Sequence, residues 1–292
     1  MKNNDQKPAI AIIPYRCWSK FNLNKLSLDL LDWPLGRPDR LQFGTIRDLR
    51  KDDHLIAFPQ KPVFLFPRLK IKAKISIMIV EPNSIHKLYI TLTKFLYWRF
   101  YKVLTKDKYL LKYIHNCSFF YFGSTILKNH QKIDITKKSM ASLIASTQNQ
   151  LIGHKLRHEI ARNIKNNQLD VAVIGAGYKP FENKEDGLKS YRYSIVIENS
   201  SEHDYFTEKL IDTCLLETVP IYWGAPNISE YFDTRGFIIC KDLDELLQAI
   251  DQMSLIDYNS KIKWIKKNKV KALYHAEYIK RAATIIHNSL KN

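Results

Sequence analysis

The sequence predicts an α/β fold in which helices cover a parallel β-sheet, and three observations support this prediction. The 292 residues are 45% hydrophobic and 26% charged, which is ordinary composition for a chain with a buried core. Short apolar runs of strand length recur through the second half of the chain. Helical patterns separate several of these runs, and such alternation of strands and helices is typical of a Rossmann-like unit.

The first eighty residues contain three runs of strand length, at 9–14, 62–67 and 71–80. The third run is rich in β-branched residues and ends at Glu81-Pro82-Asn83. Because proline cannot donate a hydrogen bond to a sheet, Pro82 predicts a turn directly after the strand. We therefore expect Glu81 to stand in a turn at a strand end.

Residues 85–114 are dense in Leu, Tyr, Phe and Trp, with Lys and Arg between them, and favour a helix. Its apolar stripe at helical spacing consists of Leu88, Leu92, Phe95 and Val103. We interpret the segment as a helix packed on the core, with lysines that extend to water. Two alternatives remain open: a helix that lies on an anionic membrane, and a platform on which nucleic-acid bases stack.

The second half is predicted to alternate strands and helices. The strand-like runs are 118–122, 142–146, 171–174, 193–197, 219–223 and 236–240. The predicted helices are 154–164, 207–216, 243–253 and a last one with the apolar stripe Ile279, Ala282, Ala283, Ile286 and Leu290. A polar, Lys-rich segment at 125–138 separates the halves, so we expect two domains, 1–135 and 136–292, the second including the C-terminal helix.

Charge and cysteine usage narrow the class of protein. The net charge of +17 attracts polyanions: nucleic acid, an anionic membrane or an acidic small substrate such as a nucleoside diphosphate. The four cysteines lie far apart without a CxxC pair, so we expect reduced thiols rather than a zinc site or disulfides. No apolar run is long enough for a transmembrane helix, and the N-terminus lacks a signal-peptide pattern. We expect a cytoplasmic protein, either soluble or peripheral on the inner membrane face.

Two polar segments follow predicted strands, and ligands of parallel sheets bind at the carboxyl ends of strands. The first strand ends at Glu198 and Asn199, and a helix begins at Thr207, a suitable N-cap. Lys209 in the first turn is unfavourable for the helix dipole unless an anion such as a diphosphate binds there. Glu208 beside it is suited to hold the two hydroxyls of a ribose. The alternative is an exposed first turn with a solvated Glu–Lys pair.

The second polar segment begins at Gly153, which opens a helix that carries Lys155, Arg157 and a histidine, a pattern typical of a helix start that faces a phosphate. A basic, solvated helix face is the alternative, and it is common in a protein of this charge. Gly175-Ala-Gly177 after another strand is a weaker signal, because the complete GxGxxG pattern with its downstream acid is missing.

Three stretches around the first segment resemble the signature of a known family. They read YRYSIVIENSS at 191–201, YFTEKLID at 205–212 and TVPIYWGAP at 218–226. In order, spacing and residue type they are similar to the donor-site signature of the family-10 α-1,3-fucosyltransferases. The chain departs from that signature at Ile197, where the family has Phe, and at positions 216–217, which are Leu and Glu here.

The resemblance implies the GT-B fold, in which two Rossmann-like domains face a cleft. The N-terminal domain (1–135) would hold the acceptor, and the C-terminal domain (136–292) would hold the nucleotide-sugar. The resemblance also implies an inverting enzyme of glycan or lipopolysaccharide biosynthesis. Such an enzyme moves fucose, or a related sugar, from GDP-fucose or a related GDP-sugar to a hydroxyl of a glycan or lipid-linked oligosaccharide.

Carried onto this sequence, the donor-binding residues are Arg157, Asn199, Tyr205, Glu208 and Lys209. Glu208 would bind the ribose, and Arg157 and Lys209 the diphosphate, while Tyr205 would line the same pocket. Glu81 matches the carboxylate general base of the family's N-terminal domain, although its turn departs from the family's Gly-Glu-Asn-like pattern. An ordinary turn carboxylate is the alternative for Glu81.

We expect no metal and no other cofactor, because no DxD motif stands near the donor site and two basic side chains can supply the positive charge. A basic nucleic-acid-binding protein is the alternative from another class, and its affinity would fall steeply with salt. A non-catalytic sugar-nucleotide binder would bind GDP without turnover. We expect a nucleotide-sugar and a glycan, rather than nucleic acid, as partners.

Overall fold

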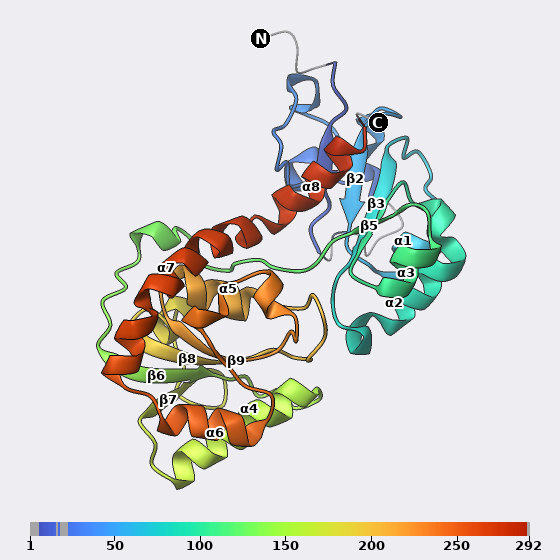
Figure 1. Ribbon diagram of the computed structural model, residues 1–292. Coiled ribbons are helices and arrows are strands. Elements are labelled where there is room, and N and C mark those ends of the chain that lie inside the picture. The colour runs from blue at the N-terminus through green and yellow to red at the C-terminus, as the bar shows by residue number, and fades with distance from the viewer. Residues whose placement is uncertain (1–5, 16, 18–22, 291–292) are drawn as a thin grey trace. The chain divides into compact units, whose positions relative to one another are not determined.

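The computed structural model describes residues 6–15, 17 and 23–290. The chain folds as two compact α/β units (Figure 1). Unit 1 comprises residues 1–121 together with 278–292, and unit 2 comprises residues 122–277. Each unit contains a five-stranded sheet whose strands all run parallel.

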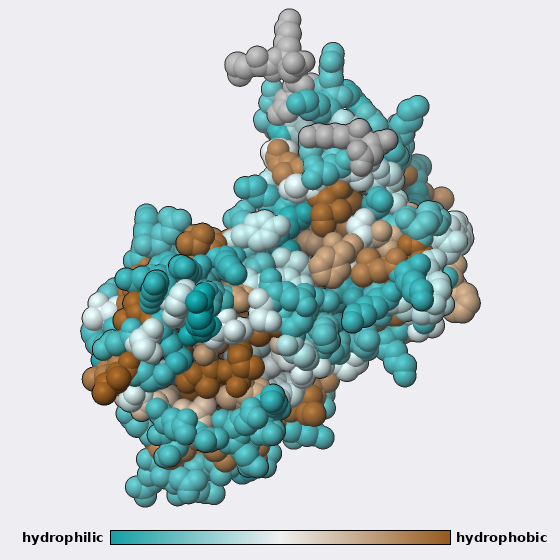
Figure 2. Space-filling view, viewed as in Figure 1, coloured by the Kyte–Doolittle hydropathy of each residue, from teal (hydrophilic) through white to brown (hydrophobic). Residues whose placement is uncertain are grey.

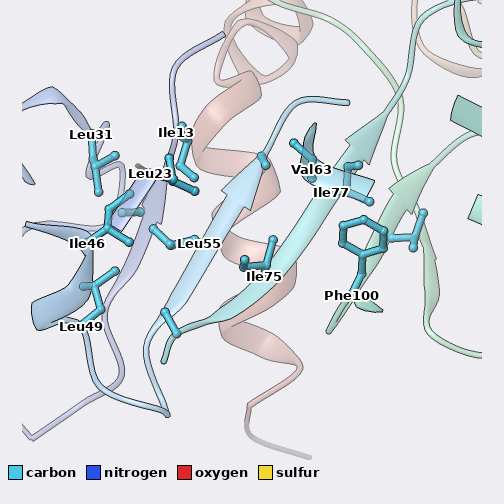
Figure 3. Packing of buried hydrophobic residues seen from close by; sticks show 14 of the residues in the cluster. Ile13, Leu23, Leu31, Ile46, Leu49, Leu55, Val63, Ile75, Ile77 and Phe100 are labelled. Carbon is cyan, nitrogen blue, oxygen red and sulfur yellow. The ribbon is translucent and has the colours of Figure 1, made fainter. Parts of the chain in front are cut away.

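The strands of the unit 1 sheet lie side by side in the order of the sequence. They are β1 (Ile10–Ile12), β2 (His54–Ala57), β3 (Lys74–Ile79), β4 (Val103–Thr105) and β5 (Cys117–Phe119). The connecting helices are α1 (Lys61–Leu65), α2 (Asn83–Leu96), α3 (Lys108–Tyr113) and the short 3-10 turns η1 (Leu23–Lys25), η2 (Leu28–Leu30), η3 (Asp39–Leu41), η4 (Ile46–Asp48) and η5 (Tyr97–Arg99). Each connection leads to the next strand in the same direction across the sheet. Right-handed connections therefore place these helices and turns on one face of the sheet. The main core of the unit, with Leu55, Ile75 and Ile77, lies on that face (Figure 3).

The other face of the unit 1 sheet is covered by the end of the chain. Helix α8 (Tyr278–Asn288) contacts β1 and β2 (Figure 1). Ala282, Ala283 and Ile286 of α8 are completely buried, and the two small alanines allow the helix to approach the sheet closely. The structure therefore differs from the predicted domains 1–135 and 136–292: the division falls after residue 121, and the C-terminal helix belongs to unit 1.

The unit 2 sheet has the strand order β10-β9-β8-β6-β7. Its strands are β6 (Ser139–Ile144), β7 (Val171–Ile174), β8 (Tyr191–Ile197), β9 (Val219–Trp223) and β10 (Ile238–Ile239). From β6 the chain moves outward to β7, then returns past β6 and continues in the opposite direction through β8, β9 and β10. The order of the strands thus reverses between β6 and β8.

Helices cover both faces of the unit 2 sheet (Figure 1). They are α4 (Ile152–Asn166), α5 (Glu208–Leu215), α6 (Leu243–Asp251) and α7 (Leu255–Ala276), with the 3-10 turns η6 (His130–Lys132), η7 (Lys184–Gly187), η8 (Ile228–Glu230) and η9 (Thr234–Gly236). Helices α4 and α6 contact one another on one face, and α5 and α7 do so on the other. Crossovers on opposite faces are what right-handed connections require when the strand order reverses.

Two sequence predictions for unit 1 are wrong. Residues 62–67 contain a short helix, α1, rather than a strand, because Pro62 suits the first turn of a helix and Val63 and Phe64 pack into the core. The helix expected over 85–114 ends at Leu96, and β4 and α3 follow it. Strand β4 pairs with β3 in the sheet, a partner that helical periodicity cannot reveal.

The predicted core stripe of this segment is also wrong in part, since Leu88 and Phe95 are exposed. Helix α7 was not predicted at all. Its buried side chains are Tyr258, Ile265, Asn268, Ala272 and His275, which form no continuous apolar stripe. The remaining strands and helices of unit 2 lie where the sequence predicts them, and β7 and β9 have the predicted bounds.

The face of the molecule seen in Figure 2 is largely hydrophilic, with patches of apolar side chains on both units. Within the described residues, no helix combines the length and the apolar character needed to cross a membrane.

Candidate functional site

A pocket of about 400 Å³ opens in unit 2 at the carboxyl ends of β6 and β8. These two strands are the neighbours between which the strand order reverses. The loops that leave them diverge to opposite faces, which creates a crevice and makes such a position the usual ligand site of an open parallel sheet. Its charged and polar lining residues include His154, Arg157, Lys184, Asn199, Glu208 and Lys209.

The first turn of α4 approaches β8 so closely that only glycine fits at position 153. A Cβ atom on Gly153 would lie 1.7 Å from the carbonyl oxygen of Glu198. The Gly153 N–H donates to the carbonyl oxygen of Asn199 over 3.2 Å. This contact sets the start of α4 beside the end of β8, and Arg157 one turn later reaches the pocket.

Arg157 is buried but retains hydrogen-bonding capacity. Its Nη2 donates to Oδ1 of Asn199 over 2.6 Å, while its Nε has no partner among the described residues. Burial lowers the pKa of the guanidinium, and the carboxylates of Glu198 and Glu208 oppose this shift. A buried donor without an acceptor next to a pocket is suited to an anionic ligand.

The end of β8 fixes the start of α5 through Glu198. The carboxylate of this fully buried residue accepts hydrogen bonds from the Thr207 N–H and the Thr207 hydroxyl, each over 2.8 Å. The Thr207 hydroxyl oxygen caps α5 by accepting from the Lys209 N–H over 3.3 Å. Burial raises the pKa of Glu198, and the nearby Lys209 ammonium opposes the rise. Glu198 therefore holds the first turn of α5, with its basic side chain, at the pocket.

Lys209 lies between two carboxylates. Its Nζ is 3.7 Å from Oε2 of Glu198 and donates to Oε1 of Glu208 over 3.3 Å. Burial lowers the pKa of Lys209, but Glu198 and Glu208 outweigh it, so the net shift is upward. For Glu208 burial raises the pKa, and Lys209 and Lys184 outweigh it in the other direction. Both side chains are thus held in their charged forms at neutral pH.

A second buried ion pair borders the same pocket, and the sequence did not reveal it. Lys184 of η7 lies 3.0 Å from Oδ2 of Asp212 and 3.9 Å from Oε1 of Glu208. Asp212 is fully buried and also accepts from the Thr125 hydroxyl over 2.5 Å. Asp212 stands one turn after Glu208 in α5, so the two acids lie on the same side of the helix. Because α5 buries most of its residues, this spacing was the sequence signal for a buried acid with a basic partner.

The structure brings together four of the five predicted donor residues: Arg157, Asn199, Glu208 and Lys209 all line the pocket. Tyr205 is not among the lining residues; its side chain is buried, and its charge opposes the lowering of the Arg157 pKa by burial. It follows Asp204, whose left-handed backbone (φ of 59°) is held by hydrogen bonds with Asn227 and Tyr231. This turn directs Tyr205 and the following phenylalanine into the core.

Glu81, the predicted base, lies in unit 1. It follows β3 at the carboxyl edge of the sheet and is half-buried before α2 begins. Burial chiefly raises the pKa of Tyr278 in α8, and the charge of Glu81 adds to that rise. Across the described ranges 6–15, 17 and 23–290, no group of three or more His, Cys, Asp or Glu side chains is arranged to hold a metal ion.

Comparison with known proteins shows which family matches the part of the chain that contains this pocket. The family model described as glycosyltransferase family 10 (fucosyltransferase), C-terminal part, matches residues 135–287. An α-(1,3)-fucosyltransferase of Helicobacter pylori is 26% identical over 162 residues, which are 53% of this chain and 32% of that protein. A GDP-fucose protein O-fucosyltransferase 3 of Xenopus laevis is 31% identical over 84 residues, 26% of this chain and 18% of that protein. The matches thus span a third or less of the length of these curated relatives.

Among solved structures, TarM is similar with a TM-score of 0.54 at 12% identity, over 83% of this chain and 55% of that one. This likeness concerns the fold, and together with the two parallel sheets it supports the GT-B class. The family model covers more than half of the sequence, including every charged residue of the pocket. The chain therefore belongs to glycosyltransferase family 10.

Proposed function

We propose that this protein transfers fucose, or a related sugar, from a GDP-sugar to a hydroxyl group of a glycan or lipid-linked oligosaccharide, with inversion at the anomeric carbon. One observation carries the proposal. Arg157 and Lys209 stand together in a pocket at the point where the strand order of a parallel sheet reverses, within the segment that the family model matches. The names of the relatives, which include a GDP-fucose-dependent enzyme, support the donor.

In this proposal the pocket binds the nucleotide part of the donor. The Arg157 guanidinium and the Lys209 ammonium neutralise the diphosphate, and Glu208 accepts hydrogen bonds from the ribose hydroxyls. When the bond from the sugar to the diphosphate breaks, negative charge grows on the leaving phosphate oxygen. Cations that are already held by Asn199, Glu198 and Glu208 stabilise that charge without having to reorganise. These side chains can supply the positive charge without a metal ion.

Glu81 is proposed as the general base. A carboxylate takes the proton of the acceptor hydroxyl while its oxygen attacks the anomeric carbon from the side opposite the diphosphate, which inverts the configuration. The position of Glu81 after β3, at the carboxyl edge of the unit 1 sheet, supports this role.

The donor proposal is tested by thermal unfolding in the presence of GDP-, UDP- and CDP-sugars. A ligand at a hundred times its Kd stabilises a protein by about 2.7 kcal/mol and raises Tm by a few degrees. We expect this shift with GDP-sugars and GDP. If none of the nucleotides changes Tm, the pocket is no donor site and the proposal is wrong.

The catalytic part is tested separately with Glu81→Gln. We expect transfer to fall by about 10²–10⁴-fold, the usual contribution of a general base, while the affinity for GDP stays unchanged. Asp39→Asn, an exposed acid of the same unit, is the matched control and should keep full activity. GDP binding without transfer in the wild-type protein would instead indicate a non-catalytic sugar-nucleotide binder.

A further inference from the structure

Helix α2 of unit 1 carries more apolar side chains than it packs on the core. Ile90 is buried in the core, and Tyr89, Leu92 and Leu96 are partly buried against it. Other large apolar side chains are exposed: Leu88 is 46% and Phe95 73% exposed, and Trp98 of η5 directly after the helix is 67% exposed. A helix that only packs on a core turns its large apolar side chains inward. The outward side chains of α2 therefore indicate an apolar contact outside the fold of unit 1.

Helix α3 extends this surface. Tyr109 and Tyr113 are 48% and 59% exposed, and their ring centres lie 4.7 Å apart. The ammonium group of Lys94 in α2 lies 4.0 Å from the ring centre of Tyr109, which joins the two helices. We call Leu88, Phe95, Trp98, Tyr109 and Tyr113 the aromatic face.

The stretch of chain that carries the aromatic face is strongly basic, and Lys94 and Lys112 lie against the rings of Tyr109 and Tyr113. Between residues 83 and 116 the basic residues are Lys87, Lys94, Arg99, Lys102, Lys106, Lys108 and Lys112. The one acid in this stretch is Asp107, whose carboxylate accepts the Leu110 N–H over 2.8 Å and caps α3. The charge of this surface thus complements an extended negative surface rather than a mixed protein surface.

We propose that unit 1 binds an anionic lipid bilayer through the aromatic face. At a membrane interface, Trp and Tyr lie at the level of the headgroups, Leu and Phe enter the acyl boundary, and lysines meet the lipid phosphates. The contact of Lys94 with the Tyr109 ring places ammonium and aromatic groups at one level, as this arrangement requires. Nucleic acid fits less well, because Leu88 offers neither charge nor a ring to phosphates or bases. This contact is independent of the proposed sugar transfer.

The experiment is flotation of the full chain with lipid vesicles. We expect binding to vesicles of phosphatidylcholine containing about 30 mol% phosphatidylglycerol, weak binding to pure phosphatidylcholine, and a decrease with added salt. Phe95→Ser/Trp98→Ser should weaken binding at least about tenfold, because the apolar anchors are removed. Lys87→Gln/Lys94→Gln should weaken it about 25-fold, about fivefold for each lysine near an anionic surface.

A matched control is available on α7 of unit 2. Val270 and Tyr274 are 68% and 62% exposed and also have lysines nearby in the sequence, so Val270→Ser/Tyr274→Ser removes similar side chains elsewhere. We expect this variant to bind vesicles like the wild type. Equal losses in the α2 and α7 variants, no preference for phosphatidylglycerol, or binding of a DNA duplex in place of vesicles would each overturn the proposal.

Insertion is measured by the fluorescence of Trp98. Lipids brominated in the acyl chain should quench tryptophan emission of the wild type, and Trp98→Phe should remove that quenching while keeping most of the binding. Quenching that is unchanged in Trp98→Phe would show that another part of the surface enters the bilayer, and the aromatic face would lose its role.

Discussion

Each sheet has five strands that run parallel within that sheet, yet only the strand order of unit 2 reverses. In unit 1 each strand lies next to its predecessor, so the connections crowd one face and α8 returns from the end of the chain to cover the other. In unit 2 the reversal between β6 and β8 sends helices to both faces and leaves a crevice at the carboxyl ends. Strand order, rather than strand composition, thus decides which sheet carries the charged pocket.

Both units bury an acid beside a basic side chain, as Asp53 and Arg40 show in unit 1, but they differ in where other buried ionisable groups lie. In unit 2 the buried carboxylates Glu198 and Asp212 lie beside Lys209 and Lys184. In unit 1 both ring nitrogens of buried His54, and Nδ1 of buried His86, have no hydrogen-bond partner within the described part of the chain. Burial lowers the pKa of each of these two imidazoles to about 4. Unit 2 places its buried acids beside lysines at the proposed ligand pocket, whereas unit 1 also contains buried histidines that stay neutral.

The largest effect is expected from Lys209→Met, which breaks the charge arrangement of unit 2. The change leaves the Glu198 carboxylate buried without its cation, and we expect unfolding free energy to fall by about 3 kcal/mol. GDP affinity should fall about 100-fold, because a charge-assisted contact with the diphosphate is lost. Calorimetric titration with GDP and chemical denaturation measure the two effects. Lys271→Met, at an exposed position of α7, should change neither quantity.

Gly153→Ala tests the close approach of α4 to β8. The added methyl group would meet the backbone of Glu198, so the start of α4 must move. We expect unfolding free energy to fall by about 2 kcal/mol, as overpacking usually does, and GDP affinity to fall because Arg157 moves with the helix. The comparison variant is Lys155→Ala, an exposed position in the same turn. Wild-type GDP affinity in Gly153→Ala would separate the start of α4 from the donor site.

The pH dependence of unit 1 follows from His54. Its folded pKa of about 4 lies below the ordinary value of 6.5, so the unfolded chain takes up the proton first. The stability that comes from neutral His54 is complete above pH 6.5 and is lost as the pH falls toward 4. Between pH 7 and 4.5, His54→Phe should gain about 2 kcal/mol of unfolding free energy relative to the wild type, after allowance for screening. A difference that stays constant with pH would remove His54 as the source.

Much of the pocket could be predicted because its residues are close in sequence. Asn199, Glu208 and Lys209 follow one strand and open one helix, so a strand–loop–helix pattern places them at a sheet edge. The ion pair of Lys184 with Asp212 joins η7, which precedes β8 in the sequence, to α5, which follows it. No local sequence pattern therefore contains both partners. The burial of Tyr205 was hidden for a related reason, since the left-handed turn at Asp204 before it depends on partners more than twenty residues away.

The fold shows the same limit. Local periodicity identifies α8 as an amphipathic helix, but it cannot tell which of two sheets the apolar stripe will cover. The outward face of α2 was equally hidden, because the pattern gives the side chains that share a face and not the direction in which the face points. Both properties depend on the strand order of unit 1, which only long-range pairing determines.

The smallest effect is expected where α8 meets the unit 1 sheet. The Tyr101 hydroxyl donates to the carbonyl oxygen of Ser289, just beyond α8, over 3.2 Å, and the Tyr101 ring lies edge-on to His54 with centres 4.6 Å apart. Tyr101→Phe keeps the ring and removes the partly buried hydrogen bonding of the hydroxyl with Ser289, so unfolding free energy should fall by about 1 kcal/mol. Hydrogen exchange should show faster opening of α8 and β2, with α4 and α5 unchanged. Tyr15→Phe, at an exposed tyrosine, is the control. If exchange instead accelerates in α4 and α5, the end of the chain stabilises unit 2 as well. The helix that covers the unit 1 sheet would then act on both units, and not on unit 1 alone as the strand orders indicate.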